Sequence, residues 1–290
     1  MNQIPNQTLY RLIRDYMNAV GTSRTTIVAL QSYMDAVRRL KCRPSDFKPL
    51  ILELNRVIRN TQPKLVSLLH LIEAFETEMQ PFFDTGLDEA KAKAGEILAR
   101  KLKQFEADTA NLTQYCTACI AGGDFIIVHS PTGYIRNALV HAHTQLHLPF
   151  RVLVLKQEFF RTKDLINALQ ENHVEHLLIP EHNLSHYLSD ATKLFISAVS
   201  ITADRKAVTG PGTANVVSIC HANTLPVYLF AETIKFSHTT LSDQHIFKEQ
   251  DHKVEGDFAF HLTAFSHDFV DLHMVDHIIT EKGEMDFPQG

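Results

Sequence analysis

The sequence lacks tryptophan altogether, has only four cysteines, and contains no apolar run near the roughly 20 residues that a membrane-spanning helix needs. Four cysteines in a chain of 290 residues do not make a disulfide framework. The net charge of −5 argues against a general nucleic-acid binder, because contacts with phosphate groups require a basic surface. Residues 1–4 begin nothing like a signal peptide, so we expect a cytoplasmic protein that makes no membrane contact.

Cysteine and histidine give no metal-site pattern. Cys116 and Cys119 form a Cys-x-x-Cys, but a zinc site needs about four ligands and no second cysteine pair follows at a usable spacing. The pair lies late in a helical pattern, which favours helix packing over redox chemistry. His143 and His147 share a helix face, but no carboxylate with a matching role lies near them in the sequence. We predict no metal site and no cofactor.

The first 120 residues have the apolar spacing of helices. Apolar side chains recur about every 3.6 residues in four stretches, 9–20, 27–40, 65–75 and 87–119. Glycine, proline and capping residues separate these stretches. We predict a helical N-terminal domain over residues 1–120.

The spacing of apolar residues along the sequence changes at Gly122 and Gly123. Beyond them, short apolar runs alternate with helical stretches of roughly 10 to 20 residues, which is typical of a doubly wound, mainly parallel sheet. The runs are 125–128, 152–155, 177–179, 194–196 and 227–230. We therefore predict an α/β fold, in which a Rossmann-like domain over residues 121–290 follows the helical domain. Residues 244–256 have the composition of a loop.

Residues 226–236 form the most informative stretch of the chain. An apolar run after Pro226 ends in the polar residues Glu232 and Lys235, which indicates a buried parallel strand with charge at its C-terminal edge. Open α/β sheets bind their ligands at that edge. The two side chains would either clamp a polar ligand or pair with each other and with the helical domain.

Two further positions allow both a binding and a structural interpretation. Residues 210–215 lie between a strand and a helix, and their glycines either turn backbone N–H groups toward an anion or form a tight turn with Thr213 as the helix cap. His129 follows the first strand, where its ring would either meet a ligand or hydrogen-bond a nearby carbonyl group.

Three motifs resemble those of a known family. Residues 231–236 are similar to the "A-E-x-x-K-F" strand, and residues 278–283 to the closing "I-I-T-E-K-G" strand, of the translation initiation factor 2B alpha, beta and delta subunits. Residues 197–213 line up without a gap against "G-A-D-x-I-x-x-N-G-x-x-x-N-K-I-G-T". The ribose-1,5-bisphosphate and methylthioribose-1-phosphate isomerases share these motifs. The resemblance runs from about residue 87 to residue 287 and implies the helical and Rossmann-like fold described above.

The resemblance also implies that the isomerase chemistry has been lost. The isomerases use a cysteine and an aspartate to move a proton between adjacent sugar carbons, and those positions hold Ser130 and Val199 here. A serine without a paired base is a poor acid or base near neutral pH, and valine cannot move a proton. Two arginines of the isomerases correspond to Glu158 and Gln62, and the family's Asn-Lys pair corresponds to residues 209–210.

We predict a non-catalytic factor 2B-like subunit that forms homo- or hetero-oligomers through its C-terminal domain. The apolar segment around Phe265, Phe269, Leu272, Val275 and Ile278 is expected to form part of the contact surface. The resemblance implies the translation initiation machinery as the partner. One alternative is a sugar-phosphate isomerase whose rewired site uses His129, Ser130 or Asp204. Another is a sensor that binds a sugar phosphate or nucleotide without converting it. The positions expected in the vestigial pocket are His129, Ser130, Thr132, Asp204, Gly210, Gly212, Thr213, Glu232 and Lys235.

Overall fold

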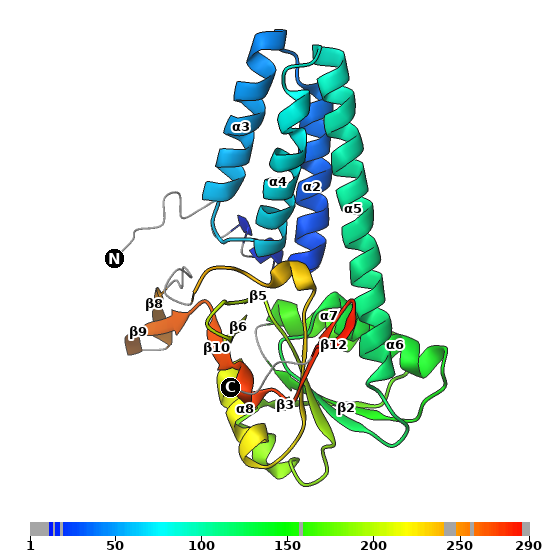
Figure 1. Ribbon diagram of the computed structural model, residues 1–290. Coiled ribbons are helices and arrows are strands. Elements are labelled where there is room, and N and C mark those ends of the chain that lie inside the picture. Colours follow the sequence, from blue (N-terminus) through cyan, green and yellow to red (C-terminus); the bar gives the residue numbers. More distant parts are fainter. Residues whose placement is uncertain are drawn as a thin grey trace. The chain divides into compact units, whose positions relative to one another are not determined.

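The computed structural model describes residues 12–285 except 14, 18–19, 157–158, 241–247 and 256–257; for 159–161, 248–255, 258–262 and 264 it describes the backbone alone. The chain divides into two compact units, Met1–Asn111 and Leu112–Gly290, with the boundary inside one long helix (Figure 1). The division proposed at residues 120 and 121 stays a prediction. Within the described ranges, no helix is both long enough and apolar enough to cross a membrane.

The first unit is built from α-helices that run side by side (Figure 1). They are α2 (Thr22–Arg39), α3 (Pro44–Asn60), α4 (Val66–Met79) and most of α5 (Leu87–Ala118), with a single 3-10 turn, η1 (Gln80–Phe82), after α4. Pro44 opens α3, where its missing N–H removes no hydrogen bond. The apolar faces pack together and bury Leu30, Ile51, Ile72, Phe75 and Leu98 completely. The helix expected over residues 9–20 lies partly outside the described residues.

A polar chain crosses this apolar bundle. The Tyr33 hydroxyl donates to Asn55 Oδ1 at 2.6 Å, and Asn55 Nδ2 donates to Glu76 Oε2 at 2.9 Å. Arg59 pairs with the same carboxylate. Burial raises the pKa of Tyr33 above its ordinary value, and the charge of Glu76 raises it further. Because each of these polar side chains has a partner, the hydrogen-bonded series fixes how α2, α3 and α4 pack against one another.

The second unit contains a seven-stranded sheet, which confirms the predicted α/β fold. In chain order its strands are β1 (Phe125–Val128), β2 (Arg151–Lys156), β3 (His176–Pro180), β4 (Lys193–Ser197), β7 (Val227–Phe230), β11 (His277–Thr280) and β12 (Gly283–Met285). Their order in space is β12-β11-β7-β4-β1-β2-β3. All neighbours are parallel except β11 and β12.

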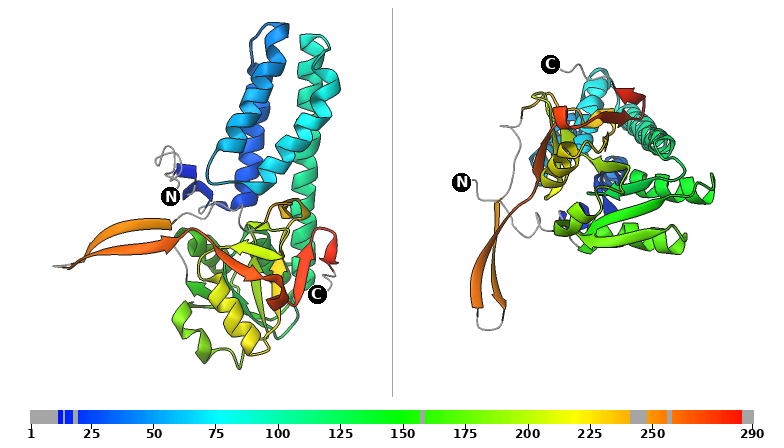
Figure 2. Two further views of the ribbon diagram at one scale, coloured as in Figure 1. Left: turned by 60° about the vertical axis from the view of Figure 1, so that its left-hand side comes forward. Right: turned by 90° about the horizontal axis from the view of Figure 1, so that it is seen from below.

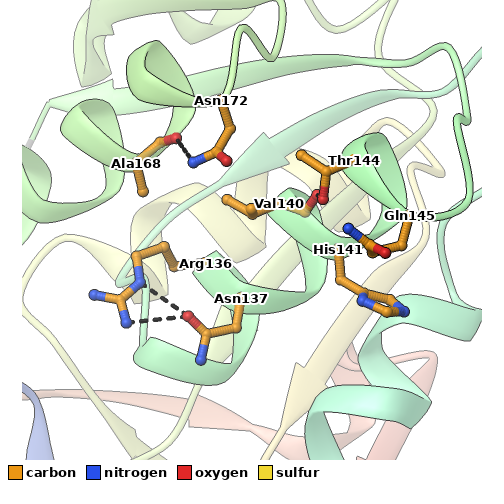
Figure 3. Close-up of a pocket in the computed structure, with 8 residues that line it drawn as sticks. All are labelled: Arg136, Asn137, Val140, His141, Thr144, Gln145, Ala168 and Asn172. Atoms are coloured by element: carbon orange, nitrogen blue, oxygen red, sulfur yellow. Dashed lines mark hydrogen bonds between the residues drawn. The ribbon is translucent and has the colours of Figure 1, made fainter.

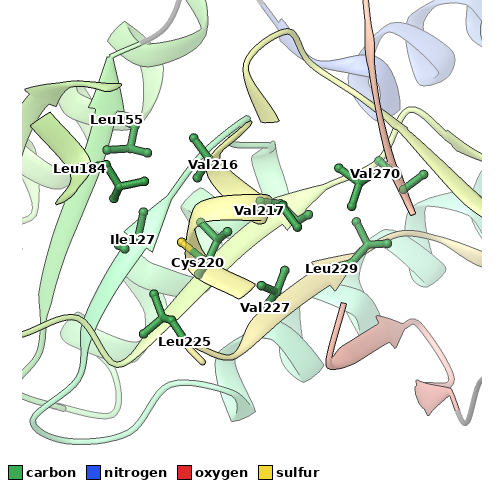
Figure 4. Close-up of a cluster of buried hydrophobic side chains, with 14 of the residues drawn as sticks. Ile127, Leu155, Leu184, Val216, Val217, Cys220, Leu225, Val227, Leu229 and Val270 are labelled. Atoms are coloured by element: carbon green, nitrogen blue, oxygen red, sulfur yellow. The ribbon is translucent and has the colours of Figure 1, made fainter. Parts of the chain in front are cut away.

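Helices cover both faces of this sheet. The end of α5, α6 (Gly133–Thr144) and α7 (Phe159–Glu171) pack on one face, and α8 (Thr213–Ala222) and η2 (Glu181–His186) pack on the other. Figure 4 shows α8 laying Val216, Val217 and Cys220 over the second face. Alternate residues of β1 enter opposite cores, since Ile126 belongs to one and Ile127 to the other. Strands buried on both faces read as continuous apolar runs, which is why the sequence shows them so clearly.

The remaining strands correct two expectations. A small sheet joins β5 (Ser200–Ile201), β6 (Lys206–Thr209) and β10 (Asp268–Asp271), with η3 (Thr233–Lys235) and η5 (Leu272–Met274) as short 3-10 turns. β8 (Lys248–Glu255) and β9 (Phe258–Phe265) lie side by side as an antiparallel pair (Figure 2). The loop predicted over residues 244–256 was therefore wrong where β8 runs, because a charged strand carries no apolar signal. Leu272 and Ile278 of the expected contact surface lie in the core, whereas Phe265 is 55% exposed.

Candidate functional site

The strand order places a topological switch point between β1 and β4. From β1 the chain continues to β2 and β3 on one side, while β4 starts the other half of the sheet. Ligands of such sheets bind outside the carboxyl ends of the strands at this point. Here the Ser197 hydroxyl, at the end of β4, donates to the carbonyl oxygen of Ser130, just beyond β1, at 2.8 Å. The two strand ends are thus joined directly.

Side chains from three elements meet at this edge. His129 is fully buried, at 0% exposure. Its Nδ1 lies 3.0 Å from the Thr213 Oγ1 atom of α8, and its Nε2 lies 2.8 Å from the Glu181 Oε1 atom of η2. Ser130 Oγ lies 3.0 Å from the same Thr213 oxygen. We call His129, Ser130, Glu181 and Thr213 the switch-point cluster.

The hydrogen bonds of Thr213 determine where the protons of the cluster lie. Its hydroxyl donates its single proton to the Gly210 carbonyl oxygen, at 2.6 Å. The Thr213 oxygen therefore accepts from both of its other neighbours, the Ser130 hydroxyl and the His129 Nδ1–H. Because Nδ1 carries a proton in this arrangement and Thr213 lies between the two groups, the geometry is not that of a base paired with Ser130.

Carboxylates already occupy the surroundings of the α8 N-terminus. Gly212 precedes the helix with a φ of 88°, and a Cβ there would lie 2.7 Å from Glu181 Oε2. Asp268 Oδ2 accepts the Ala214 N–H at 3.2 Å. Negative charge is favourable at this end of a helix. The expected cap is corrected: Gly212 is the N-cap, and Thr213 is the first helical residue, whose hydroxyl bonds back to Gly210.

Glu232 and Lys235 pair with each other beyond the end of β7. Lys235 Nζ lies 2.8 Å from Glu232 Oε2, and the two side chains are 0% and 1% exposed. Lys235 Nζ also lies 5.5 Å from the centre of the Tyr134 ring, and the Tyr134 hydroxyl donates to the Phe230 carbonyl at 2.9 Å. Burial raises the pKa of Tyr134 to about 12. Of the two roles considered for Glu232 and Lys235, this geometry is that of an internal ion pair.

The other predicted positions do not belong to the switch-point cluster. Thr132 is the N-cap of α6, and Asp204 is exposed in the turn between β5 and β6. Val199 is half-buried, and its N–H donates to the Val208 carbonyl at 2.8 Å. Glu158 lies outside the described residues. Gln62 belongs to the first unit.

Sequence reasoning missed three residues of this edge, Glu181, Ser197 and Asp268. Glu181 directly follows the last residue of β3, and Glu232 lies two residues beyond the end of β7. The position of Glu181 at a strand end was therefore a usable signal. Ser197 ends β4 and could have been found in the same way. Asp268 comes from β10, a strand whose pairing partners are remote in the sequence.

The cysteine pair agrees with the packing interpretation. Cys116, on α5, is buried in the core of the second unit, and burial raises the pKa of the Cys119 thiol to about 11. Both thiols are free. Within the described part of the chain, no group of three or more histidine, cysteine or carboxylate side chains is arranged to hold a metal ion.

A separate groove of about 550 Å³ lies between α6 and α7 (Figure 3). Arg136 in this groove donates to the neighbouring Asn137 side chain and pairs with Asp164. Its lining side chains are Arg136, Asn137, Val140, His141, Thr144, Gln145, Ala168 and Asn172. None of the sequence-predicted site residues lines this groove.

Comparison with known proteins identifies the family. The model of the initiation factor 2 subunit family matches residues 18–287, so the chain belongs to that family. It is 25% identical over 234 residues to a putative translation initiation factor eIF-2B subunit 2-like protein of Pyrococcus horikoshii, covering 80% of each chain.

Solved structures share the fold at low sequence identity. A P. horikoshii translation initiation factor eIF-2B has a TM-score of 0.78 at 21% identity, covering 99% of both chains. The tetrameric eIF2B-beta2-delta2 complex of C. thermophilum gives 0.72 at 14% identity, covering 97% of this chain and 90% of that one. The 5-methylthioribose 1-phosphate isomerase of P. horikoshii gives 0.73 at 13% identity, covering 97% and 83%. Both branches of the predicted resemblance are thus represented.

Proposed function

We propose that this chain is a non-catalytic, factor 2B-like subunit that acts in the cytoplasm through assembly with other protein chains of the translation initiation machinery. The arrangement of the switch-point cluster carries the proposal. Ser130 donates its proton to Thr213, and the facing nitrogen of His129 already holds a proton. An isomerase needs an acid and a base that reach adjacent sugar carbons, and these groups are bonded to one another instead.

Assembly is supported by the relatives and by one exposed side chain. A solved relative with the same fold is a tetramer of beta and delta subunits. Phe265, at the end of β9, is 55% exposed, and large aromatic side chains are enriched in protein interfaces. We propose that the C-terminal unit contributes the contact surface of a homo- or hetero-oligomer.

Direct assay of turnover tests the absence of catalysis. The purified protein is incubated with ribose 1,5-bisphosphate or with methylthioribose 1-phosphate, and the sugar signals are followed by NMR. We expect both spectra to remain unchanged. Isomerisation by the wild-type protein that Ser130→Ala abolishes would overturn the proposal.

Light scattering tests the assembly. We expect the mass of the purified chain in solution to be that of a dimer or a larger oligomer, and Phe265→Asp to shift the protein toward the monomer. A wild-type protein that is monomeric at every concentration would refute self-assembly, and co-purification with a beta- or delta-type subunit would then test the hetero-oligomer.

A rewired isomerase is the second candidate, and one observation favours it. The contacts from Ser130 through Thr213 and His129 to Glu181 form a continuous hydrogen-bonded series that ends in a carboxylate with 33% exposure. Such a series resembles the arrangement that orients a base. In this function Glu181→Gln would abolish turnover, whereas a non-catalytic protein has no turnover to lose.

A further inference from the structure

The Glu181 carboxylate lies where an open α/β sheet would hold an anionic ligand. Its Oε1 atom is 2.8 Å from the buried Nε2 atom of His129, at the carboxyl end of β1. Its Oε2 atom lies against Gly212, which precedes α8. A strand end at the switch point and a glycine before a helix N-terminus are two features with which such folds bind phosphate groups.

We propose that Glu181 is an internal ligand, whose carboxylate occupies the anion position of the switch-point crevice and excludes phosphate-bearing small molecules from it. The inference deepens the proposed function and rests on it, because it explains why the crevice takes up no sugar phosphate. A carboxylate can stand in for a phosphate here, since both groups present anionic oxygens.

The geometry of His129 supports this role. Thr213 holds Nδ1, so the ring presents Nε2 to Glu181 from a fully buried position. A buried polar group without a partner is costly, and Glu181 supplies that partner. The hydrogen bond between His129 Nε2 and Glu181 Oε1 keeps the buried nitrogen satisfied with no external ligand.

Gly212 makes the close approach of Glu181 feasible. Any larger residue would place a Cβ atom 2.7 Å from Oε2 and 3.0 Å from Oε1 of the carboxylate. The side chain of Glu181 is nevertheless one third exposed. The carboxylate therefore lies between the buried ring and solvent, and its removal exposes this position from outside.

Charge strengthens the exclusion. Asp268 already accepts the Ala214 N–H in the first turn of α8. An incoming phosphate would meet both this carboxylate and that of Glu181, and like charges at close range repel one another strongly where water is excluded. Truncation of Glu181 removes one of these two charges and takes away the carboxylate that lies 2.8 Å from His129 Nε2.

Titration with inorganic phosphate tests the inference. Binding to the full-length wild type, Glu181→Ala and Glu181→Gln is measured by calorimetry and by the phosphate-dependent shift in melting temperature, with potassium chloride at equal ionic strength as the salt control. Glu175→Ala removes an exposed carboxylate just before β3 and serves as the matched variant. We expect Glu181→Ala to bind phosphate at least tenfold more tightly than the wild type and Glu175→Ala, with Glu181→Gln between them.

The outcomes separate this inference from the proposed function. A folded Glu181→Ala with no gain in phosphate binding overturns the inference, as does a wild type that binds phosphate as tightly as the variant. Should Glu181→Ala fail to fold, Glu181→Gln decides by the same comparison. Turnover of sugar phosphates by the wild type refutes the proposed function instead, whatever the phosphate titration shows.

Discussion

Replacing Lys235 by methionine should destabilise the protein far more than the loss of a surface charge would. The substitution keeps most of the aliphatic stem but leaves the Glu232 carboxylate, 1% exposed, without its cation. At the 2.8 Å separation of Nζ and Oε2, and with an effective dielectric constant of about 20, the gross attraction is about 6 kcal/mol. Breaking a buried pair by removing one partner costs about 3–5 kcal/mol. We expect a loss in that range in the free energy of unfolding.

Urea denaturation followed by far-ultraviolet circular dichroism measures this loss. The matched control is Lys206→Met, which removes the cation of a partly exposed pair with Asp271 and should cost less than about 1 kcal/mol. The double variant Glu232→Met/Lys235→Met leaves no unpaired charge, so it should be more stable than either single variant. A Lys235→Met penalty below that of the control, or a double variant as unstable as the sum of the singles, would refute the reasoning.

The pH dependence of this penalty follows from the pKa of Lys235. Burial alone would lower that pKa, but the Glu232 carboxylate and the Tyr134 side chain outweigh burial and raise it above the ordinary value. A lysine with a raised pKa in the folded state stabilises fully below its unfolded pKa, about 10.4, and loses that contribution as pH rises through the folded value. As pH rises, the difference between wild type and Lys235→Met should therefore begin to shrink only above about pH 10. A difference that already shrinks below pH 9 contradicts this.

Three further substitutions test local geometry by the same denaturation assay. Gly212→Ala should cost about 1–3 kcal/mol, because the residue has a left-handed φ that an alanine adopts only under strain; an unchanged midpoint would show that this strain is absent. Asp268→Ala removes the carboxylate that accepts the Ala214 N–H and should cost about 0.5–2 kcal/mol. Asp268→Asn keeps an oxygen that can accept this N–H and should therefore lose less stability. Asn55→Ala breaks the polar chain of the helical unit and should cost about 1–3 kcal/mol; a neutral result would mean that water replaces the amide.

The main sheet was predictable because strands that are buried on both faces appear in the sequence as continuous apolar runs. Each of the five apolar runs falls within one of the strands β1, β2, β3, β4 and β7. The helices of the first unit were predictable for the related reason that one face of each is apolar. β8 was not, because its charged residues take their strand conformation from pairing with β9 rather than from their own composition.

The candidate site could be predicted only in part. Polar residues that directly follow apolar runs, such as His129 and Glu232, can be recognised in the sequence as residues at strand ends. The partner of His129 does not, because Glu181 lies 52 residues away and reaches the ring only through the order of the strands. The ion pair of Glu232 and Lys235 was open to two interpretations in the sequence, since composition does not reveal whether a ligand stands between two charges.

A nitrogen-15 NMR spectrum of the His129 imidazole tests most directly whether internal hydrogen bonds close the crevice. The bonds of Thr213 require a proton on Nδ1, and the predicted spectrum shows Nδ1 protonated at neutral pH, with that proton protected from exchange with solvent. A bare Nδ1 that accepts a hydrogen bond would place a base within reach of Ser130 through Thr213, and would contradict the view that this site is not poised for chemistry.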